Sequence, residues 1–223
     1  MLITGFPAGM FATNCYIVAP HEGGPAVIVD PGQEAIPGVK EILAERDLTP
    51  EAVLLTHGHL DHTWTAQPLA DEYGIPVYIH PDDRVMLADP LAGIGPGLAQ
   101  FIQGMEFTEP KELVEIGDGD KLELAGITLT VDHTPGHTRG SVVFGIEVAS
   151  DNGPIDVVFS GDTLFQMSIG RTDLPGGNHQ QLLDSIAAKL LTRDDSTVVL
   201  PGHGNATSIG DERRANPFLE GIQ

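Results

Sequence analysis

Short, continuous runs of apolar and β-branched residues recur along the chain and constrain its fold more than any other feature. Runs such as AVIVD (26–30) and AVLLT (52–56) lack the strict alternation of a strand with one face in water. They are typical of strands that are covered on both faces. We expect strands at residues 15–19, 26–30, 52–56, 76–80, 121–132 with a turn at Ala125-Gly126, 141–148, 155–162 and 197–202.

Helical periodicity separates several of these runs. We expect helices at residues 35–47, from His62 to about Tyr73, at 81–89 and at 178–192. Asn178 is suited to the N-cap of the last helix, and Pro68 predicts a kink or a late start in the second. Strands that need cover on both faces, alternating with helices, predict a mixed α/β fold in which sheets lie between helix layers.

The expected domain organisation follows from the length of the chain and from the positions of its Gly- and Pro-rich segments. A chain of 223 residues is long enough for one substantial core, and we expect a single domain over residues 1–223. The segment from Pro90 to Gly119 is rich in Gly and Pro and follows no clean period. It is either a surface connector or a wall or lid of an active site, because long loops in compact domains are often functional.

Charge and cysteine content exclude several classes of protein. The chain has 11 Lys and Arg against 32 Asp and Glu, a net charge of −21, which disfavours nucleic acid and anionic membrane partners. Cys15 is the only cysteine, so neither an intrachain disulfide nor a cysteine-based zinc knuckle is available. No Lys or Arg precedes Lys40 and no apolar run is long enough to span a membrane, so we expect a cytoplasmic protein.

The stretch THGHLDH contains four residues of metal-binding type within six positions: His57, His59, Asp61 and His62. It follows an expected strand, and residues i and i+2 of an extended chain project to the same side, so His57 and His59 are able to hold one ion. Asp61 and His62 lie where the chain turns into a helix and point elsewhere, which suggests a second ion. Taken singly, Asp61 is also suited to a helix N-cap, and any one histidine to a hydrogen-bonded core position.

Three further ligand types stand directly after other expected strands. His137 lies in TPGHT, Asp162 in SGDTL and His203 in PGHGN, each beside a glycine that permits a tight turn. Open α/β sheets commonly carry their sites along the edge where such strand ends meet. Nitrogen and oxygen ligands without thiolate suit Zn²⁺, Fe or Mn²⁺, and seven ligands fit two metals that share one carboxylate.

THGHLDH, PGHT, SGDTLF and PGHG, in this order and spacing, resemble the metallo-β-lactamase-fold hydrolases. TPGHTRGSV together with SGDTLF is most similar to the glyoxalase II (hydroxyacylglutathione hydrolase) branch. The resemblance implies a four-layer αββα sandwich with two metals at one edge. It further implies a first metal held by His57, His59 and His137, a second held by Asp61, His62 and His203, and Asp162 bridging both together with a water or hydroxide.

The chemistry implied is hydrolysis with Asp61 and Asp162 at its centre. A bound metal lowers the pKa of its water to about 7, so hydroxide is available without a serine or cysteine nucleophile. A thiol of pKa about 8.5 leaves as thiolate without a strong general acid, which favours a thioester substrate. We therefore expect a hydrolase of small-molecule thioesters with two divalent ions, Zn²⁺ first among them and Fe or Mn the alternatives.

Two departures from the glyoxalase II pattern keep the substrate open. Only 20 residues follow His203, so we expect a short form without the full C-terminal helical domain that helps those enzymes bind glutathione. The sequence GRTD (170–173) is similar to persulfide dioxygenases, which share the fold but use one iron held by two histidines and an aspartate. An iron-dependent persulfide dioxygenase and a lactonase or esterase therefore remain alternatives.

Other readings of the same ligands are less compatible with the chain. Flavodiiron modules carry Glu where His59 stands, and nucleases of this fold are disfavoured by the net charge of −21. Arg171 and Asp173 form either a structural ion pair or a substrate-binding pair in which Arg171 binds a carboxylate. His133 suits a position behind the ligands or in the core. The sequence leaves the oligomeric state open.

Overall fold

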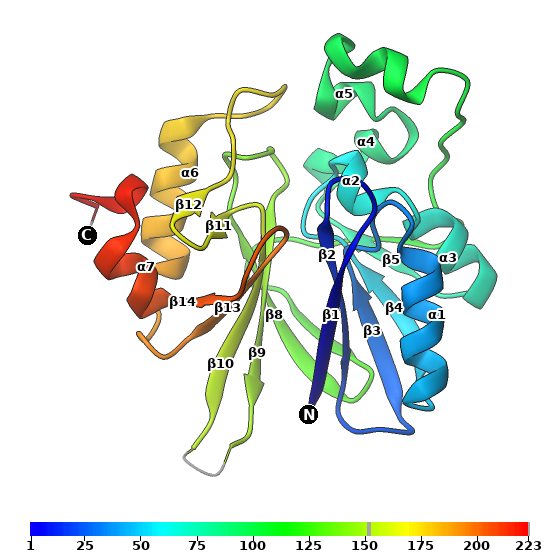
Figure 1. The fold of residues 1–223 in the computed structure, drawn as a ribbon, viewed down its shortest axis with the longest axis horizontal. Helices are drawn as coiled ribbons and strands as arrows, with labels where there is room; N and C mark the ends of the chain where they lie inside the picture. The colour runs from blue at the N-terminus through cyan, green and yellow to red at the C-terminus, as the bar shows by residue number, and fades with distance from the viewer. Residues whose placement is uncertain (151–152, 223) are drawn as a thin grey trace.

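Two β-sheets lie face to face at the centre of the molecule, and helices cover the outer face of each (Figure 1). The structure is a computed structural model, and it describes residues 1–150 and 153–222. From one side to the other the layers are helix, sheet, sheet and helix. The expected mixed α/β fold with an αββα arrangement is confirmed.

The first sheet has six strands in chain order, from β1 to β6. β1 to β3 pair antiparallel, whereas β3 to β6 pair parallel. The strands are β1 Leu2–Ala8, β2 Thr13–Ala19, β3 Pro25–Val29, β4 Thr49–Leu54, β5 Val77–Ile79 and β6 Leu113–Glu115. The helices beside this sheet are α1 Ala35–Glu45, α2 Leu60–Thr63 and α3 Ala66–Tyr73.

The second sheet also has six strands, in the order β14-β13-β10-β9-β8-β7. Only β10 and β13 pair parallel. The strands are β7 Lys121–Leu124, β8 Ile127–His133, β9 Val142–Val148, β10 Ile155–Gly161, β13 Val198–Pro201 and β14 Thr207–Ser208, and a separate hairpin joins β11 Leu164–Phe165 to β12 Ser168–Ile169. The helical segments of this half are α6 His179–Ser185, its π-helical continuation η3 Ile186–Leu190, α7 Ile209–Ala215 and η4 Pro217–Leu219.

Short helical turns occupy much of the chain between β5 and β6. They are η1 Pro81–Asp83, α4 Val85–Ala88, α5 Leu91–Ile94 and η2 Pro96–Ile102. In Figure 1 they lie above the first sheet, on the same side as α2.

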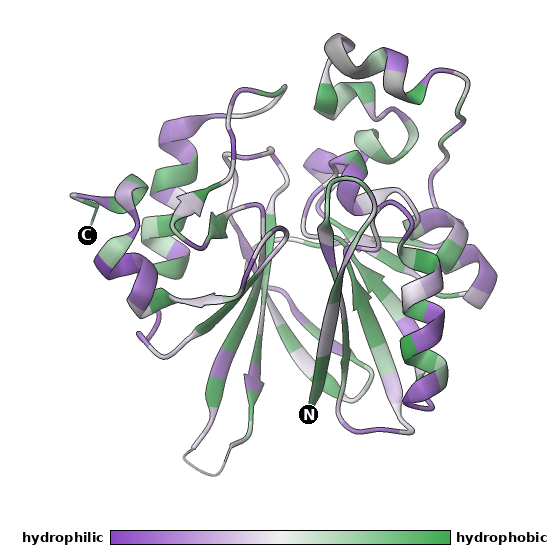
Figure 2. Cartoon of the chain, viewed as in Figure 1, coloured by the Kyte–Doolittle hydropathy of each residue, from purple (hydrophilic) through white to green (hydrophobic). Residues whose placement is uncertain are grey.

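Alternate residues along the strands enter different layers of the core. Ile28 belongs to the core under α1 and α3, whereas its neighbour Val27 belongs to the core between the sheets. On the second sheet, Phe144 lies between the sheets and Val143 lies in the core under α6. Figure 2 shows hydrophobic residues along the strands and hydrophilic stretches on the covering helices. Both faces of the central strands are thus buried, as the apolar runs predict.

The expected elements are present with shifted boundaries. All eight expected strand regions contain strands, and the run expected at 52–56 forms β4 at Thr49–Leu54. The helix expected from His62 is broken into α2 and α3, with Pro68 in the first turn of α3. Asn178 caps α6 by accepting a hydrogen bond from the Gln181 backbone N–H. Among residues 1–150 and 153–222, no helix combines the length and the apolar character needed to cross a membrane.

Candidate metal centre

The seven residues singled out in the sequence meet at one edge of the two sheets. His57 and His59 follow β4, and Asp61 and His62 lie in α2. The remaining three, His137, Asp162 and His203, follow β8, β10 and β13. His59, rather than Asp61, occupies the N-cap position of α2, so the alternative role of Asp61 as a helix cap is wrong.

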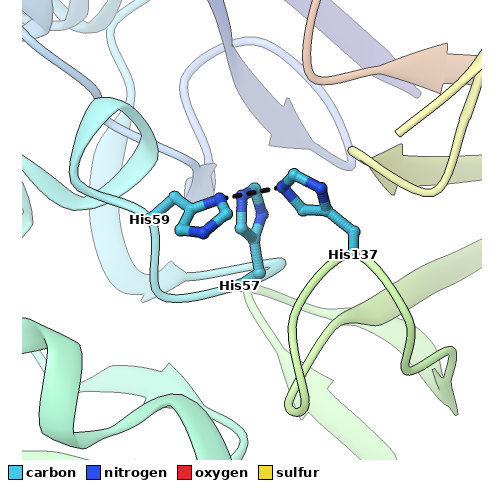
Figure 3. Close-up of side chains that lie close together, drawn as sticks. All are labelled: His57, His59 and His137. Atoms are coloured by element: carbon cyan, nitrogen blue, oxygen red, sulfur yellow. Dashed lines mark hydrogen bonds between the residues drawn. The ribbon is translucent and has the colours of Figure 1, made fainter. Parts of the chain in front are cut away.

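His57, His59 and His137 form a buried group of three imidazoles (Figure 3). His59 Nδ1 lies 2.8 Å from His137 Nε2. One nitrogen from each of the three rings lies within 4.8 Å of the others, a spacing that suits one shared cation. The loop after β4 and the turn after β8 therefore supply one group of three ligands.

Asp61, His62 and His203 form a second group. His203 Nε2 lies 3.2 Å from Asp61 Oδ2 and 3.3 Å from His62 Nε2. Asp61 Oδ2 also lies 3.5 Å from His62 Nε2. This group joins α2 to the turn after β13.

Asp162 lies between the two groups. Its Oδ1 is 3.3 Å from His62 Nε2, while its Oδ2 is 3.6 Å from both His137 Nε2 and His203 Nε2. A Cβ on Gly202 would lie 2.4 Å from Asp162 Oδ1 and 2.6 Å from His62 Cε1, so this close approach requires glycine. One carboxylate therefore reaches ligand atoms of both groups.

Four of the five histidine rings are oriented by a contact on the nitrogen that faces away from the group. His57 Nδ1 contacts Thr56 Oγ1 at 3.1 Å, and His62 Nδ1 contacts Asp30 Oδ2 at 2.9 Å. His137 Nδ1 contacts the Arg171 carbonyl at 2.7 Å, and His203 Nδ1 contacts the Phe11 carbonyl at 3.1 Å. Carbonyl and carboxylate oxygens only accept, so Nδ1 carries the proton on His62, His137 and His203. In the neutral rings the Nε2 lone pairs are then left to face the other ligand atoms, as in protein metal sites.

Several polar atoms of the centre have no hydrogen-bond partner within the described part of the chain. They are the buried atoms His57 Nε2, His59 Nε2 and Asp162 Oδ1, the last of which has only the 3.3 Å contact with His62 Nε2, without hydrogen-bond geometry. A buried polar atom without a partner costs about 1–3 kcal/mol. Divalent metal ions would supply the missing partners, and an imidazole and carboxylate donor set suits them. The arrangement therefore implies divalent metal ions without fixing which element.

Burial and opposite charges set the protonation of the ligands. Burial lowers the pKa of His57 well below its usual value and that of His59 to about 3, so both rings are neutral. Burial also opposes protonation of His62, but Asp162, Asp61 and Asp30 together raise its pKa well above the usual value. The pKa values of Asp61 and Asp162 are lowered despite burial, chiefly by His62. The carboxylates are thus ionised, and they favour positive charge between them.

Asp30, which sequence reasoning missed, supports the second group from behind. Its carboxylate accepts hydrogen bonds from the Thr56 backbone N–H at 2.8 Å and the Thr56 hydroxyl at 2.6 Å, besides contacting His62. It has a positive φ of 48°, which aspartate tolerates better than most residues. The sequence feature that could have identified Asp30 is its position after an apolar strand. His57 and Asp162 follow apolar strands in the same way.

Asp83, also missed, joins the two loops of the first group. It is fully buried and accepts hydrogen bonds from the Gly58 N–H (2.9 Å), the Gly140 N–H (2.7 Å) and the Thr138 hydroxyl (2.6 Å). Burial raises its pKa. A Cβ on Gly140 would lie 2.7 Å from the Asp83 carboxyl carbon, so glycine permits this contact. The neighbouring Asp82 is exposed, and the sequence alone does not indicate which of these two adjacent aspartates is buried.

A cavity of about 420 Å³ opens onto the metal centre. Its lining includes His59, Asp61, His137, Asp162 and His203, together with Phe11, Leu60, Ile94, Phe165, Ile169, Arg171 and Leu174. Ile94 ends α5, so the segment expected between Pro90 and Gly119 contributes a wall of the cavity. The start of the segment therefore lines the cavity, while most of the segment belongs to the connection from β5 to β6.

The remaining polar residues singled out in the sequence lie outside the ligand groups. Arg171 Nε and Nη2 donate to the two carboxylate oxygens of Asp173 at 2.7 and 2.8 Å. Arg171 lines the cavity, whereas Asp173 is not among the lining residues. His133 stacks on His80 with ring centroids 4.1 Å apart. Cys15 is fully buried, and burial raises its pKa.

Comparison with known sequences identifies the family. The sequence model of the Metallo-beta-lactamase superfamily matches residues 8–203, a span that contains all seven candidate ligand residues. An uncharacterised protein of Mycobacterium leprae is 62% identical over 223 residues, covering 100% of both chains. The probable metallo-hydrolase YqgX of Bacillus subtilis is 40% identical, covering 97% of this chain and 96% of its own. The hydroxyacylglutathione hydrolase GloC of Haemophilus influenzae is 36% identical, covering 98% of each.

Solved structures agree with the sequence matches. The BLEG-1 B3 metallo-beta-lactamase superposes with a TM-score of 0.83 at 39% identity, covering 99% of this chain and 100% of its own. TTHA1623 in a di-iron-bound form gives 0.77 at 34% identity, covering 98% and 100%. ETHE1 from Myxococcus xanthus gives 0.76 at 28% identity, covering 97% and 84%. Because the family match spans most of the chain and includes the whole metal centre, this protein belongs to the metallo-beta-lactamase superfamily.

Proposed function

We propose that this protein is a metal-dependent hydrolase with a dinuclear site that cleaves small thioesters, as enzymes of glyoxalase II type do. The observation that carries the proposal is the division of seven ligand residues into two groups joined by one carboxylate. His57, His59 and His137 would hold the first ion, and Asp61, His62 and His203 the second. Asp162, which approaches both groups, would bridge them.

Bound divalent ions supply a water-derived nucleophile at neutral pH and polarise the carbonyl that it attacks. Asp162 and Asp61 hold the negative charge that keeps this edge of the sheets attractive to cations. Hydrolysis adds water across the acyl carbon–sulfur bond, giving a carboxylic acid and a thiol. None of the described residues that line the cavity is an evident general acid, and a thiol leaving group has little need of one.

The relatives support two ions and a thioester substrate. TTHA1623, at 34% identity, was solved in a di-iron-bound form, and GloC, at 36% identity, is named as a hydroxyacylglutathione hydrolase. Zn²⁺ fits the imidazole and carboxylate donors and is our first choice, while Fe and Mn²⁺ suit the same donor set.

A metal assay combined with a substrate panel tests the proposal. The purified protein would be analysed for Zn, Fe and Mn and then assayed with thioesters, lactones and a β-lactam, before and after treatment with a chelator. We expect about two ions per chain and thioester hydrolysis that is lost with the chelator and returns with added metal. Absence of metal-dependent hydrolysis of every thioester would contradict the proposal, and turnover of lactones alone would favour a lactonase.

A persulfide dioxygenase is the second candidate, favoured by GRTD and by the similarity to ETHE1 from Myxococcus xanthus. It would use one iron held by two of the histidines together with Asp162. About one iron per chain, with oxygen uptake and sulfite release from a persulfide but no thioester hydrolysis, would establish it in place of the hydrolase.

A further inference from the structure

The cavity beside the metal centre is walled by apolar side chains. Phe11, Leu60, Ile94, Phe165, Ile169 and Leu174 supply this wall. Phe165 lies next to the ligand His203, with ring centroids 6.2 Å apart, so the apolar wall begins where the metal ligands end. A substrate bound with its carbonyl at the ligands therefore places the rest of its length against hydrocarbon.

Arg171 is the one Lys or Arg side chain among the described residues that line the cavity. Its Nε and Nη2 donate to both oxygens of the Asp173 carboxylate, so one edge of the guanidinium fork is occupied. The pair is exposed, with 61% of the Arg171 side chain and 67% of the Asp173 side chain accessible to solvent. It carries no net charge at the edge of the cavity.

The other charged groups of the cavity are carboxylates. Asp61 and Asp162 belong to the two candidate ligand groups, where bound ions would offset their charge, so Asp173 is the carboxylate nearest to Arg171 that no ion would neutralise. A substrate carboxylate that reached Arg171 would have to displace Asp173 and then lie beside it. Like charges that close repel, and repulsion of this kind is a common basis of specificity.

These features bear on the choice of thiol carrier. We propose that the cavity selects thioesters whose carrier bears no charged group, and that Asp173 is the specificity-determining residue because it neutralises Arg171. The inference rests on the proposed thioester hydrolase function. The proposed carrier differs from glutathione, the thiol in the name of the relative GloC. A glutathione thioester carries two carboxylates and an ammonium group, and the cavity wall offers its carboxylates no Lys or Arg that is free of an ion pair.

A pair of substrates with the same acyl group tests the selection. We would compare S-lactoyl-N-acetylcysteamine, which is uncharged, with S-lactoylglutathione, using the metal-loaded protein. Because the apolar wall and Asp173 both disfavour the anionic carrier, we expect kcat/KM to be at least about tenfold higher for the uncharged thioester. An equal or higher kcat/KM for the glutathione thioester would overturn the inference while leaving the hydrolase function intact.

A binding experiment tests the same inference without catalysis. Calorimetry would compare S-hexyl-N-acetylcysteamine with S-hexylglutathione, two thioethers that cannot be hydrolysed. Tighter binding of the uncharged thioether is expected, and a preference for S-hexylglutathione would overturn the inference. If neither lactoyl thioester were hydrolysed, the proposed function would fail, but this measurement would still decide which carrier the cavity prefers.

The role of Asp173 is tested with Asp173→Asn, which removes the charge at constant shape. The freed Arg171 should raise the affinity for S-hexylglutathione, relative to the uncharged thioether, by about fivefold. The double variant Asp173→Asn/Arg171→Gln should lose this gain. Asp47→Asn, an exposed aspartate outside the cavity lining, is the matched control and should leave the ratio unchanged. An unchanged ratio in Asp173→Asn would show that Asp173 does not set specificity.

Discussion

Two regions of one site are built in opposite ways. The metal floor, by which we mean the seven candidate ligand residues, is largely buried, and four of its five imidazoles have a second contact that orients the ring. The apolar wall, formed by Phe11, Leu60, Ile94, Phe165, Ile169 and Leu174, comes from loops and short elements, and several of its side chains are partly exposed. Fixed ligands suit a chemistry that depends on geometry, whereas the wall is free to set which molecule is accepted.

The largest effect is expected from removing a ligand of the metal floor. His57→Ala deletes a fully buried imidazole whose Nε2 has no protein partner. Loss of a hydrogen-bond partner behind a metal ligand lowers metal affinity by up to about 100-fold. Loss of the ligand itself should lower metal affinity at the first group by more than that. Metal analysis and thioester hydrolysis would measure the loss, with the exposed His179→Ala as control. Full metal content in His57→Ala would show that His57 is not a metal ligand.

Asp83→Ala tests whether the floor depends on a contact between loops. It leaves the buried Gly58 and Gly140 N–H groups without their acceptor. Each unsatisfied buried group costs about 1–3 kcal/mol, so we expect the free energy of unfolding to fall by about 3 kcal/mol.

Urea denaturation of the metal-free protein would measure this change. Asp82→Ala is the matched control, because the Asp82 side chain is 56% exposed and such surface changes are usually within about 0.5 kcal/mol. Equal stability of the two variants would mean that Asp83 does not hold the loops together.

Asp30→Asn is expected to have an intermediate effect. Asparagine tolerates the positive φ of this position and can still accept from His62, but it removes the charge. Metal affinity at the second group should fall by about tenfold, the lower end of the range for such partners. Competition with a chromogenic chelator would measure it, and Asp47→Asn, which also has a positive φ, is the control. Unaltered affinity would confine Asp30 to a purely structural role.

The contrast between floor and wall also explains what the sequence can predict. His57, His137 and His203 are identifiable because histidine is uncommon and each follows an apolar strand, so chemistry and position indicate the same site. Asp30 and Asp83 have the same residue type as many surface acids. Their roles depend on Thr56 and Gly140, which are distant in sequence and become neighbours only in the folded chain.

Two of the strands missed in the sequence, β1 and β6, have a similar explanation. β1 reads LITGFPA, in which Gly5 and Pro7 interrupt the apolar pattern, and it lies at the edge of its sheet with only β2 beside it. Edge strands tolerate such residues because one side makes no ladder. β6 has three residues and is likewise an edge strand. Central strands have to be apolar on both faces, so they are the ones that a pattern of apolar runs detects.

The smallest effect is expected in the apolar wall, from Ile94→Ala. The side chain is partly buried at the end of α5 and lines the cavity, so truncation removes hydrocarbon contact from a bound ligand but no metal ligand. At about 0.8 kcal/mol for each buried CH₂ group, partial loss of contact should weaken S-hexyl-N-acetylcysteamine binding by about fivefold. Metal content should match the unmodified protein. Leu91→Ala, on the same helix but outside the cavity lining, is the control. If Ile94→Ala instead lowered metal content and left thioether binding intact, α5 would belong to the floor, and the division between a fixed floor and a selective wall would not hold.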